Sequence, residues 1–132
     1  MRRYRVAIVG ATGVVGQELL KILAERDFPI AKLTLLASAR SKGKHVEFQG
    51  EALRVEEVSE NSLAGHDIAF FAAGASVSRE FAEGAIERGA LVIDNSSAFR
   101  MDPEVPLVVP QVTPTNTTVR IRCGKKIRLK IR

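Results

Sequence analysis

Short apolar runs alternate along the chain with stretches in which apolar residues recur every three or four positions. The runs predict buried strands, and the spaced stretches predict amphipathic helices. Strands are expected at residues 5–9, 32–37, 67–73, 91–94 and 107–109, with a short hairpin at 46–48 and 53–58 around Gln49-Gly50. Helices are expected at 14–26 and from Ser76, as the N-cap, to Arg88-Gly89. This alternation predicts an α/β fold of the Rossmann type, a doubly wound, mostly parallel sheet with helices on both faces.

The pattern changes after Val112. Residues 113–118 are rich in Thr, Pro and Asn, and residues 119–132 alternate basic and apolar residues in two runs broken at Gly124. We therefore expect one domain over residues 1–112 and a divergent basic tail over 113–132, which is either disordered or a β-hairpin around Gly124-Lys125. The abrupt change also raises the hypothesis of a frameshift or an artificial join.

The positive charge of the chain belongs to this tail. The formal net charge is +5, but residues 1–119 hold 13 Lys and Arg with all 15 acids, a net −2, and residues 120–132 hold the other seven cations. Seven cations can neutralise nucleic-acid phosphates, so nucleic-acid binding by the tail is one alternative. The tail has no aromatic residue for base stacking, which makes this alternative the weakest.

Composition excludes several classes of protein. With 45% apolar and 27% charged residues, the chain is neither disordered nor fibrous. One cysteine cannot close an internal disulfide, and two histidines do not form a zinc-like cluster. The longest strongly apolar stretch, around residues 68–75, is too short to cross a bilayer. We expect a cytoplasmic protein without a metal or a membrane segment.

The glycine pattern Gly10-Ala11-Thr12-Gly13-Val14-Val15-Gly16 lies between the first expected strand and the first expected helix. Such a turn brings backbone N–H groups and the positive end of a helix dipole to a pyrophosphate, which is typical of dinucleotide-binding folds. A purely structural strand-to-helix turn is the alternative. The residues expected to contact the cofactor here are Gly10, Thr12, Gly13, Val14 and Val15.

The end of the second strand favours NADP over NAD. An acidic residue at this place would bind the free ribose 2′-hydroxyl of NAD, but the sequence has Ala37-Ser38-Ala39-Arg40-Ser41-Lys42. Arg40 and Ser41 can bind a 2′-phosphate instead, although Arg40 could also be a solvated loop cation. Ala73 and Gly74, after the next long strand, are expected near the nicotinamide half of the cofactor, unless Gly74 is a plain turn residue.

The stretch Leu91-Val92-Ile93-Asp94-Asn95-Ser96-Ser97-Ala98-Phe99-Arg100, the run Pro106-Leu107-Val108-Val109-Pro110-Gln111-Val112 and the glycine turn together resemble the amino-terminal half of aspartate-semialdehyde dehydrogenases. The resemblance covers about Arg5 to Val112. N-acetylglutamyl-phosphate reductases share the glycine turn and are the weaker match, because their corresponding stretch usually lacks the Asn-Ser-Ser-Ala-Phe-Arg sequence.

This resemblance implies NADP-dependent reductive dephosphorylation of aspartyl phosphate to aspartate semialdehyde, within lysine, threonine and methionine synthesis. It also implies that Arg100 binds the substrate phosphate and that Asn95 lies in the active-site loop. A guanidinium suits a phosphate chemically, and pairing of Arg100 with Asp94 or Asp102 is the structural alternative.

The family's catalytic residues are not matched. Members continue after the position of Val112 into an Asn-Pro-Asn-Cys segment and a second domain with a catalytic histidine, whereas this chain continues into its basic tail. Cys123, between Arg122 and Gly124, has no matching context, and neither His45 nor His66 corresponds to the family's base. We therefore expect a truncated, inactive domain that binds NADP.

A stand-alone nucleotide-binding or regulatory module is the main alternative to this interpretation. A missing second domain would leave an apolar surface exposed, so we expect a homo-oligomer or a partner chain at that surface.

Overall fold

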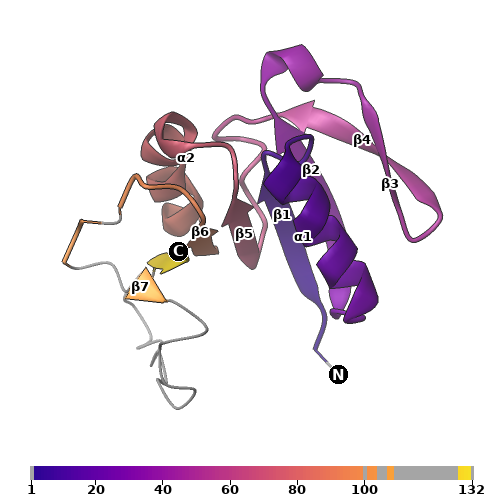
Figure 1. Ribbon diagram of the computed structural model, residues 1–132, viewed down its shortest axis with the longest axis horizontal. Helices are drawn as coiled ribbons and strands as arrows, with labels where there is room; N and C mark the ends of the chain where they lie inside the picture. Colours follow the sequence, from indigo (N-terminus) through magenta and orange to yellow (C-terminus); the bar gives the residue numbers. More distant parts are fainter. Residues whose placement is uncertain (1, 100, 104–106, 109–127, 132) are drawn as a thin grey trace.

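The computed structural model describes residues 2–99, 101–103, 107–108 and 128–131. The order of elements is β1 (Tyr4–Val9), α1 (Val14–Glu25), β2 (Ile30–Ala37), the short 3₁₀ turn η1 (Ala39–Ser41), β3 (His45–Phe48), β4 (Glu51–Glu57), β5 (Ile68–Phe71), α2 (Ala75–Glu87), β6 (Leu91–Asp94), β7 (Leu107–Val108) and β8 (Arg128–Ile131). Figure 1 shows α1 alongside β1 and β2, with α2 beside β5 and β6.

The strands form one sheet in the order β3-β4-β2-β1-β5-β6-β8-β7. Every neighbouring pair is parallel except β3 with β4, which form an antiparallel hairpin. From β1 the chain goes first to β2 on one side and later to β5 on the other. The strand order therefore reverses at β1, which is where ligands bind in sheets of this kind.

Two apolar clusters cover the two faces of the sheet. Leu20 and Leu23 of α1 pack with Val6, Ile8 and Leu35 on one face. The second cluster unites α2 with the alternate strand residues: it contains Ala7, Val9, Leu36, Ala69, Phe71, Ala82, Ala85, Ile86 and Val92. This arrangement confirms the expected doubly wound α/β fold with helices on both faces.

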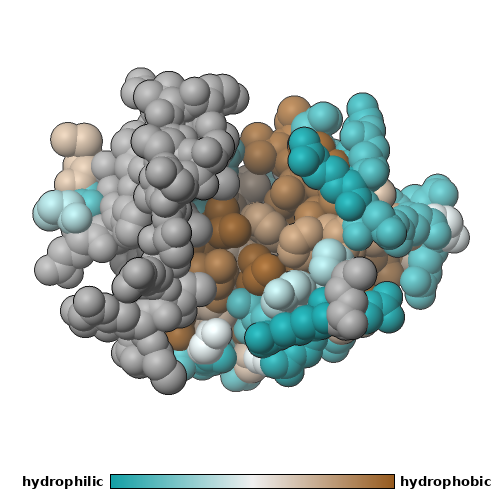
Figure 2. All heavy atoms as spheres, turned by 90° about the horizontal axis from the view of Figure 1, so that it is seen from below, coloured by the Kyte–Doolittle hydropathy of each residue, from teal (hydrophilic) through white to brown (hydrophobic). Residues whose placement is uncertain are grey.

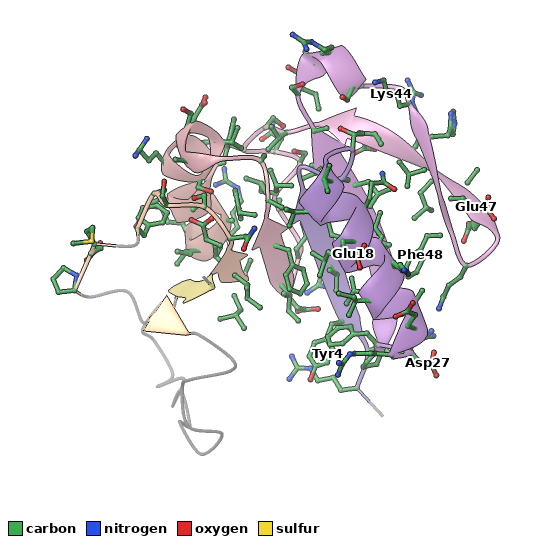
Figure 3. All side chains as sticks on the ribbon, in the orientation of Figure 1. Tyr4, Glu18, Asp27, Lys44, Glu47 and Phe48 are labelled. Carbon is green, nitrogen blue, oxygen red and sulfur yellow. The ribbon has the colours of Figure 1, made fainter. Side chains whose placement is uncertain are left out.

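The hairpin follows its sequence signal closely. Gln49 and Gly50 both have positive φ, +50° and +81°, as a two-residue hairpin turn requires. Phe48, at the end of β3, packs against the α1 cluster. Figure 3 shows Phe48 and Glu47 on this hairpin beside α1.

The start of α2 differs from the expectation. Ser76 was predicted as the N-cap, but the helix begins at Ala75 and its N-cap is Gly74, without a side-chain cap. Gly74 has φ of +92°, a conformation that glycine adopts at little cost. Because the turn is completed at Gly74, Ser76 lies inside the first helical turn.

One half of the sheet's α1 face is only partly covered. β5 and β6 each alternate half-buried and buried residues, and the half-buried ones are Ile68, Phe70, Leu91 and Ile93. The large apolar residues of α1 that are exposed are Val14, Val15 and Ile22. Figure 2 shows apolar residues gathered in the middle of the face seen from below.

The described part of the tail includes β8. Its residues pair in parallel register with β6, from Val92 opposite Arg128 to Asp94 opposite Lys130, and with β7 on the other side. Gly124, Lys125 and the rest of the expected hairpin lie outside the described residues.

Candidate dinucleotide site

A crevice of about 370 Å³ opens where the strand order reverses. It lies at the carboxyl ends of β1, β2 and β5, the position at which doubly wound sheets bind nucleotides. Its lining residues are Val9, Gly10, Thr12, Gly13, Ala37, Ser38, Val58, Ala72, Ala73 and Val77. Four of the predicted cofactor residues, Gly10, Thr12, Gly13 and Ala73, therefore line one cavity.

The glycines of the turn meet different surroundings. A Cβ on Gly10, which has φ of +95°, would lie 2.6 Å from the carbonyl oxygen of Ala72, and a Cβ on Gly16 would collide with the carbonyl oxygen of Gly10. A Cβ on Gly13 would meet only ordinary contact, 3.5 Å from that same oxygen. Gly10 and Gly16 thus allow the turn to pack, and Gly13 borders the crevice.

The amino end of α1 is suited to an anion. Gly13 is the N-cap and makes no side-chain cap, and the first turn carries no acidic residue. Val14 and Val15 are exposed there. The N–H groups of a helix's first turn have no partner within the helix, so a phosphate at this end would receive hydrogen bonds as well as favourable dipole interaction.

The loop after β2 is joined to the glycine turn by one side-chain hydrogen bond. The Thr12 hydroxyl donates to Ser41 Oγ at 3.2 Å. Ser41 is buried and directed toward Thr12, whereas its neighbour Arg40 is exposed on η1. The two residues predicted to bind the 2′-phosphate therefore differ in exposure. Arg40 is exposed, where a ligand can reach it, whereas Ser41 is buried and connects the two loops.

The turns after β5 and β6 lie side by side. Asn95 donates its backbone N–H to the carbonyl oxygen of Phe71 at 2.9 Å, and Ala72 N–H donates to Val9 at 2.8 Å. Ala73, Gly74 and Asn95 are all exposed. The structure therefore brings Asn95 to the same edge of the sheet as the crevice, while Arg100 lies outside the described residues.

A buried network that sequence reasoning missed lies behind Asn95. The Asp94 side chain is 1% exposed and accepts hydrogen bonds from Ser78 Oγ, Ser96 N–H and Ser96 Oγ. Ser38, Val58 and Val77 of the crevice were also missed. A carboxylate at the end of an apolar strand was the one available signal, since Asp94 follows Leu91-Val92-Ile93 directly.

A second, larger cavity of about 610 Å³ lies between α1 and the hairpin. Glu18 and Lys21 of α1 and Glu47 and Phe48 of the hairpin are among the residues that line it. Figure 3 labels Glu18, Glu47 and Phe48. It adjoins the glycine turn through Thr12 and Gly13. With two carboxylates and one ammonium among these residues, it suits a nucleotide phosphate less well than the crevice does.

Neither histidine is placed as a base at the crevice. His66 is 7% exposed, and its ring nitrogens lie 3.1 Å from the Leu63 carbonyl oxygen and 2.9 Å from Thr34 Oγ1. His45 is exposed on β3, at the far edge of the sheet. Cys123 lies outside the described residues.

The described part of the chain contains no group of three or more His, Cys, Asp or Glu residues that could hold a metal ion. No helix within it combines the length and the apolarity needed to cross a membrane.

Comparison with known proteins identifies the family to which this chain belongs. The family described as "Semialdehyde dehydrogenase, NAD binding domain" matches residues 5–119, which is most of the chain. The chain belongs to this family. The match includes the glycine turn, both loops after β2 and β5, and the stretch around Asn95.

Among individual relatives of this semialdehyde dehydrogenase domain, the aspartate-semialdehyde dehydrogenase of Synechocystis sp. is 56% identical over 110 residues, covering 83% of this chain and 32% of that protein. The Bacillus subtilis enzyme of the same name is 56% identical over 111 residues, covering 84% and 32%. The chain therefore spans about a third of the length of these curated relatives and matches their amino-terminal nucleotide-binding domain.

Solved structures of aspartate-semialdehyde dehydrogenases share the fold of this chain. Aspartate semialdehyde dehydrogenase II of Vibrio cholerae, complexed with ASA, superposes with a TM-score of 0.79 at 49% identity, covering 84% of this chain and 36% of that one. The Candida albicans enzyme with NADP gives a TM-score of 0.66 at 27% identity, covering 83% and 34%. A nicotinamide dinucleotide is therefore the cofactor class of this domain.

Proposed function

We propose that the chain binds NADP in the crevice at the carboxyl ends of β1, β2 and β5, as the nucleotide-binding part of an aspartate-semialdehyde dehydrogenase. The observation that carries this proposal is the joining of three features at one edge of the sheet. These are the turn that Gly10 and Gly16 permit, the uncapped amino end of α1 and the cavity they border. The NADP named with the Candida albicans relative supports it.

In this proposal the pyrophosphate lies against the turn of Gly10, Thr12 and Gly13 and the first residues of α1, Val14 and Val15. The N–H groups there bind it, and no side chain competes, since α1 has no capping side chain. Ala73 and Gly74 lie at the nicotinamide side, where small residues leave room for the ring. When bound, the cofactor supplies a hydride acceptor or donor.

Arg40 is the residue proposed to select NADP. It is exposed on η1, and the hydrogen bond between Thr12 and Ser41 fixes that turn against the phosphate-binding loop. A guanidinium at this place gives the 2′-phosphate a charged hydrogen bond that NAD cannot use. Ser41 supports the same 2′-phosphate site from its buried position.

The experiment compares NADP and NAD affinities by calorimetry for the wild type, Arg40→Ala and Lys42→Ala. Loss of a hydrogen bond to a charged group costs about 1.5–3 kcal/mol, so Arg40→Ala is expected to weaken NADP at least about tenfold and leave NAD unchanged. Lys42, an exposed cation two residues away, is the matched control. An unchanged ratio of the two affinities in Arg40→Ala would contradict the assignment.

We further propose that Asn95 and Arg100 bind the phosphate of an acyl-phosphate substrate, beside the nicotinamide. Asn95 is exposed next to the turn after β5, to which its backbone is bonded through Phe71. A guanidinium and an amide are both suitable donors to a phosphate oxygen. In this proposal the domain at residues 1–112 carries the cofactor site and the residues that bind the substrate phosphate.

We also propose that two copies of the chain associate through the half-buried side chains Ile68, Phe70, Leu91 and Ile93. Parallel sheets are normally covered on both faces. In the register of β5 with β6, Ile68 lies opposite Leu91 and Phe70 opposite Ile93, and all four are half-buried although Ile68 and Phe70 also contact the α1 cluster. The same patch on two copies can form a two-fold symmetric interface.

Sedimentation velocity at increasing concentration tests this association, with Ile93→Thr as the variant. Threonine keeps the branched shape that strands favour but adds a polar hydroxyl to the surface. The wild type is expected to pass from monomer to dimer, and Ile93→Thr to remain monomeric at the same concentration with unchanged circular dichroism. A wild type that stays monomeric throughout would rule the interface out.

A further inference from the structure

The loop at residues 95–99 carries Asn95 and leads to Arg100, yet it contains no regular helix or strand. Something must therefore fix its shape if it is to present a ligand site. Asn95 and Ser97 are exposed along it, whereas Ser96 between them is half-buried. Phe99, near its end, packs against the α2 apolar cluster.

The Asp94 carboxylate accepts three hydrogen bonds, and two of them come from Ser96 at the start of this loop. Ser96 N–H donates to Asp94 Oδ1 at 2.8 Å, and Ser96 Oγ donates to Oδ2 at 3.0 Å. The Ser96 hydroxyl also accepts from Ala98 N–H at 3.2 Å. Two of these bonds engage backbone N–H groups, those of Ser96 and Ala98, so the backbone of the loop is held at both residues.

The third bond ties the loop to α2. Ser78, in the first turn-and-a-half of that helix, is fully buried and donates its hydroxyl to Asp94 Oδ1 at 3.0 Å. That helix begins directly after the turn of Ala73 and Gly74. Asp94 therefore lies between the turn proposed for the nicotinamide and the loop proposed for the substrate phosphate.

A buried carboxylate is expensive unless its hydrogen bonds are satisfied. At Asp94 the bonds come from two serines and a backbone N–H, and no ion pair with it is found among the described residues. A leucine or valine would continue the apolar strand of residues 91–93 at less cost in desolvation. The carboxylate's distinct contribution is the geometry of the loop.

We propose that Asp94 is a positioning residue, which through Ser96 and Ser78 holds the loop in the shape that presents Asn95 to a phosphate-class oxyanion. This inference rests on the proposed function of the loop. It adds two residues, Asp94 and Ser78, that would touch neither cofactor nor substrate but would set the distance between their sites.

The test uses the full chain and four variants: Ser96→Ala, Ser96→Thr, Ser97→Ala and Asp94→Asn. Ser96→Ala removes a bond to Asp94 and one from Ala98, Ser96→Thr restores the hydroxyl, and Ser97→Ala is the matched control in the same loop. Asp94→Asn keeps the shape of the side chain but replaces one of its two acceptor oxygens with an NH₂ group. The donors of Ser78 and Ser96, which now bind two oxygens, are then left with one. The readouts are backbone amide hydrogen exchange, NADP affinity and binding of inorganic phosphate followed by amide NMR shifts.

In Ser96→Ala, amides 96–98 are expected to exchange at least about fivefold faster, since one hydrogen bond contributes about 1 kcal/mol. Phosphate affinity is expected to fall by a similar factor. NADP affinity and exchange in β1 are expected to stay within about twofold of the wild type, which loss of overall stability would not allow. Asp94→Asn should shift the same amides, and Ser96→Thr and Ser97→Ala should behave as wild type.

The inference is overturned if exchange at residues 96–98 is unchanged in both Ser96→Ala and Asp94→Asn. It is also overturned if Ser97→Ala loosens the loop as much as Ser96→Ala does. Should the wild type bind neither NADP nor phosphate while loop exchange still responds to Ser96→Ala, the proposed function fails and the positioning of the loop by Asp94 stands.

Discussion

Three glycines of one motif have three different physical roles at the scale of single residues. Gly10 needs its positive φ and the space beside Ala72, Gly16 needs contact with the Gly10 carbonyl, and Gly13 has room for a methyl group. The spacing in the sequence predicted the turn and its helix. It could not tell which glycines packing requires, because the Cβ of Gly10 would meet the segment after β5, and the Cβ contacts of Gly13 and Gly16 depend on how closely the turn folds back on Gly10.

Gly16→Ala and Gly13→Ala therefore form a matched pair. Gly16→Ala is expected to destabilise the fold by about 1–3 kcal/mol, as overpacking does, because its Cβ collides with the Gly10 carbonyl oxygen. Gly13→Ala is expected to lose less than about 1 kcal/mol, the scale of a changed helix cap. Urea denaturation measures both changes.

The same pair separates folding from binding. At Gly13 the added methyl group would stand where the pyrophosphate approaches, so NADP affinity should fall about tenfold or more, in line with the cost of overpacking by 1–3 kcal/mol. Equal stability losses in the two variants, or unchanged NADP affinity in Gly13→Ala, would contradict these roles.

At the scale of elements, the hydrophobic pattern placed nearly every described strand and helix. It located β6 at its observed bounds and the β3–β4 hairpin by its turn residues. It placed the start of α2 too late, because a serine at 76 is a good N-cap by type, whereas the backbone at Gly74 already completes the turn. Caps depend on φ and ψ, which the pattern of apolar residues does not report.

The entry to β5 is fixed by an ion pair whose partners are 62 residues apart. The backbone N–H of Arg5 donates to Asp67 Oδ2 at 2.8 Å, and its guanidinium donates to both carboxylate oxygens. These bonds lower the pKa of Asp67 below its ordinary value, and hydrogen bonding to Arg5 is the largest cause. The pair joins the first residues of β1 to the segment that opens β5.

Asp67 thus makes the stability of the fold depend on pH. A carboxylate with a lowered pKa in the folded state stabilises it above its ordinary pKa of about 3.9, and the contribution is lost as the pH falls through the lowered value. Asp67→Asn is therefore expected to be less stable than the wild type at pH 6, with the difference shrinking below about pH 4.

Denaturant midpoints at pH 6, 4 and 3 measure this dependence. Asp27→Asn, at an exposed position with positive φ that asparagine also tolerates, is the control. Figure 3 shows Asp27 beyond the end of α1. A stability difference between Asp67→Asn and the wild type that stays constant from pH 6 to pH 3 would show that the charge of Asp67 contributes nothing.

At the scale of the whole chain, the sequence spans about a third of the length of its curated relatives and matches their amino-terminal nucleotide-binding domain. Its described histidines are engaged in packing or lie at the far edge of the sheet. Among the described residues, those that line the crevice include no histidine, cysteine or carboxylate.

The 132-residue chain by itself is expected to bind NADP without turnover. Phosphate-dependent reduction of NADP with aspartate semialdehyde, followed by absorbance at the wavelength of the reduced cofactor, measures this. The full-length Bacillus subtilis relative serves as the positive control for the assay. Robust activity of the isolated chain would overturn the expectation.

The sequence by itself determined the class of fold, the position of the glycine turn and the family, because these follow from local periodicity and from a contiguous motif. The location of the charge was equally visible: the net −2 of residues 1–119 and the +7 of residues 120–132 need no structure. Such properties depend on neighbours in the chain.

Only the tertiary structure decided which residues meet. It brought the turn after β1 to Ser41, the end of β6 to Ser78, and β8 to the edge of β6. Each of these contacts joins elements distant in sequence, and each depends on the order of strands in the sheet. A hydrogen bond or a packed methyl group depends on positions set to within about an ångström, and local sequence patterns do not carry that information.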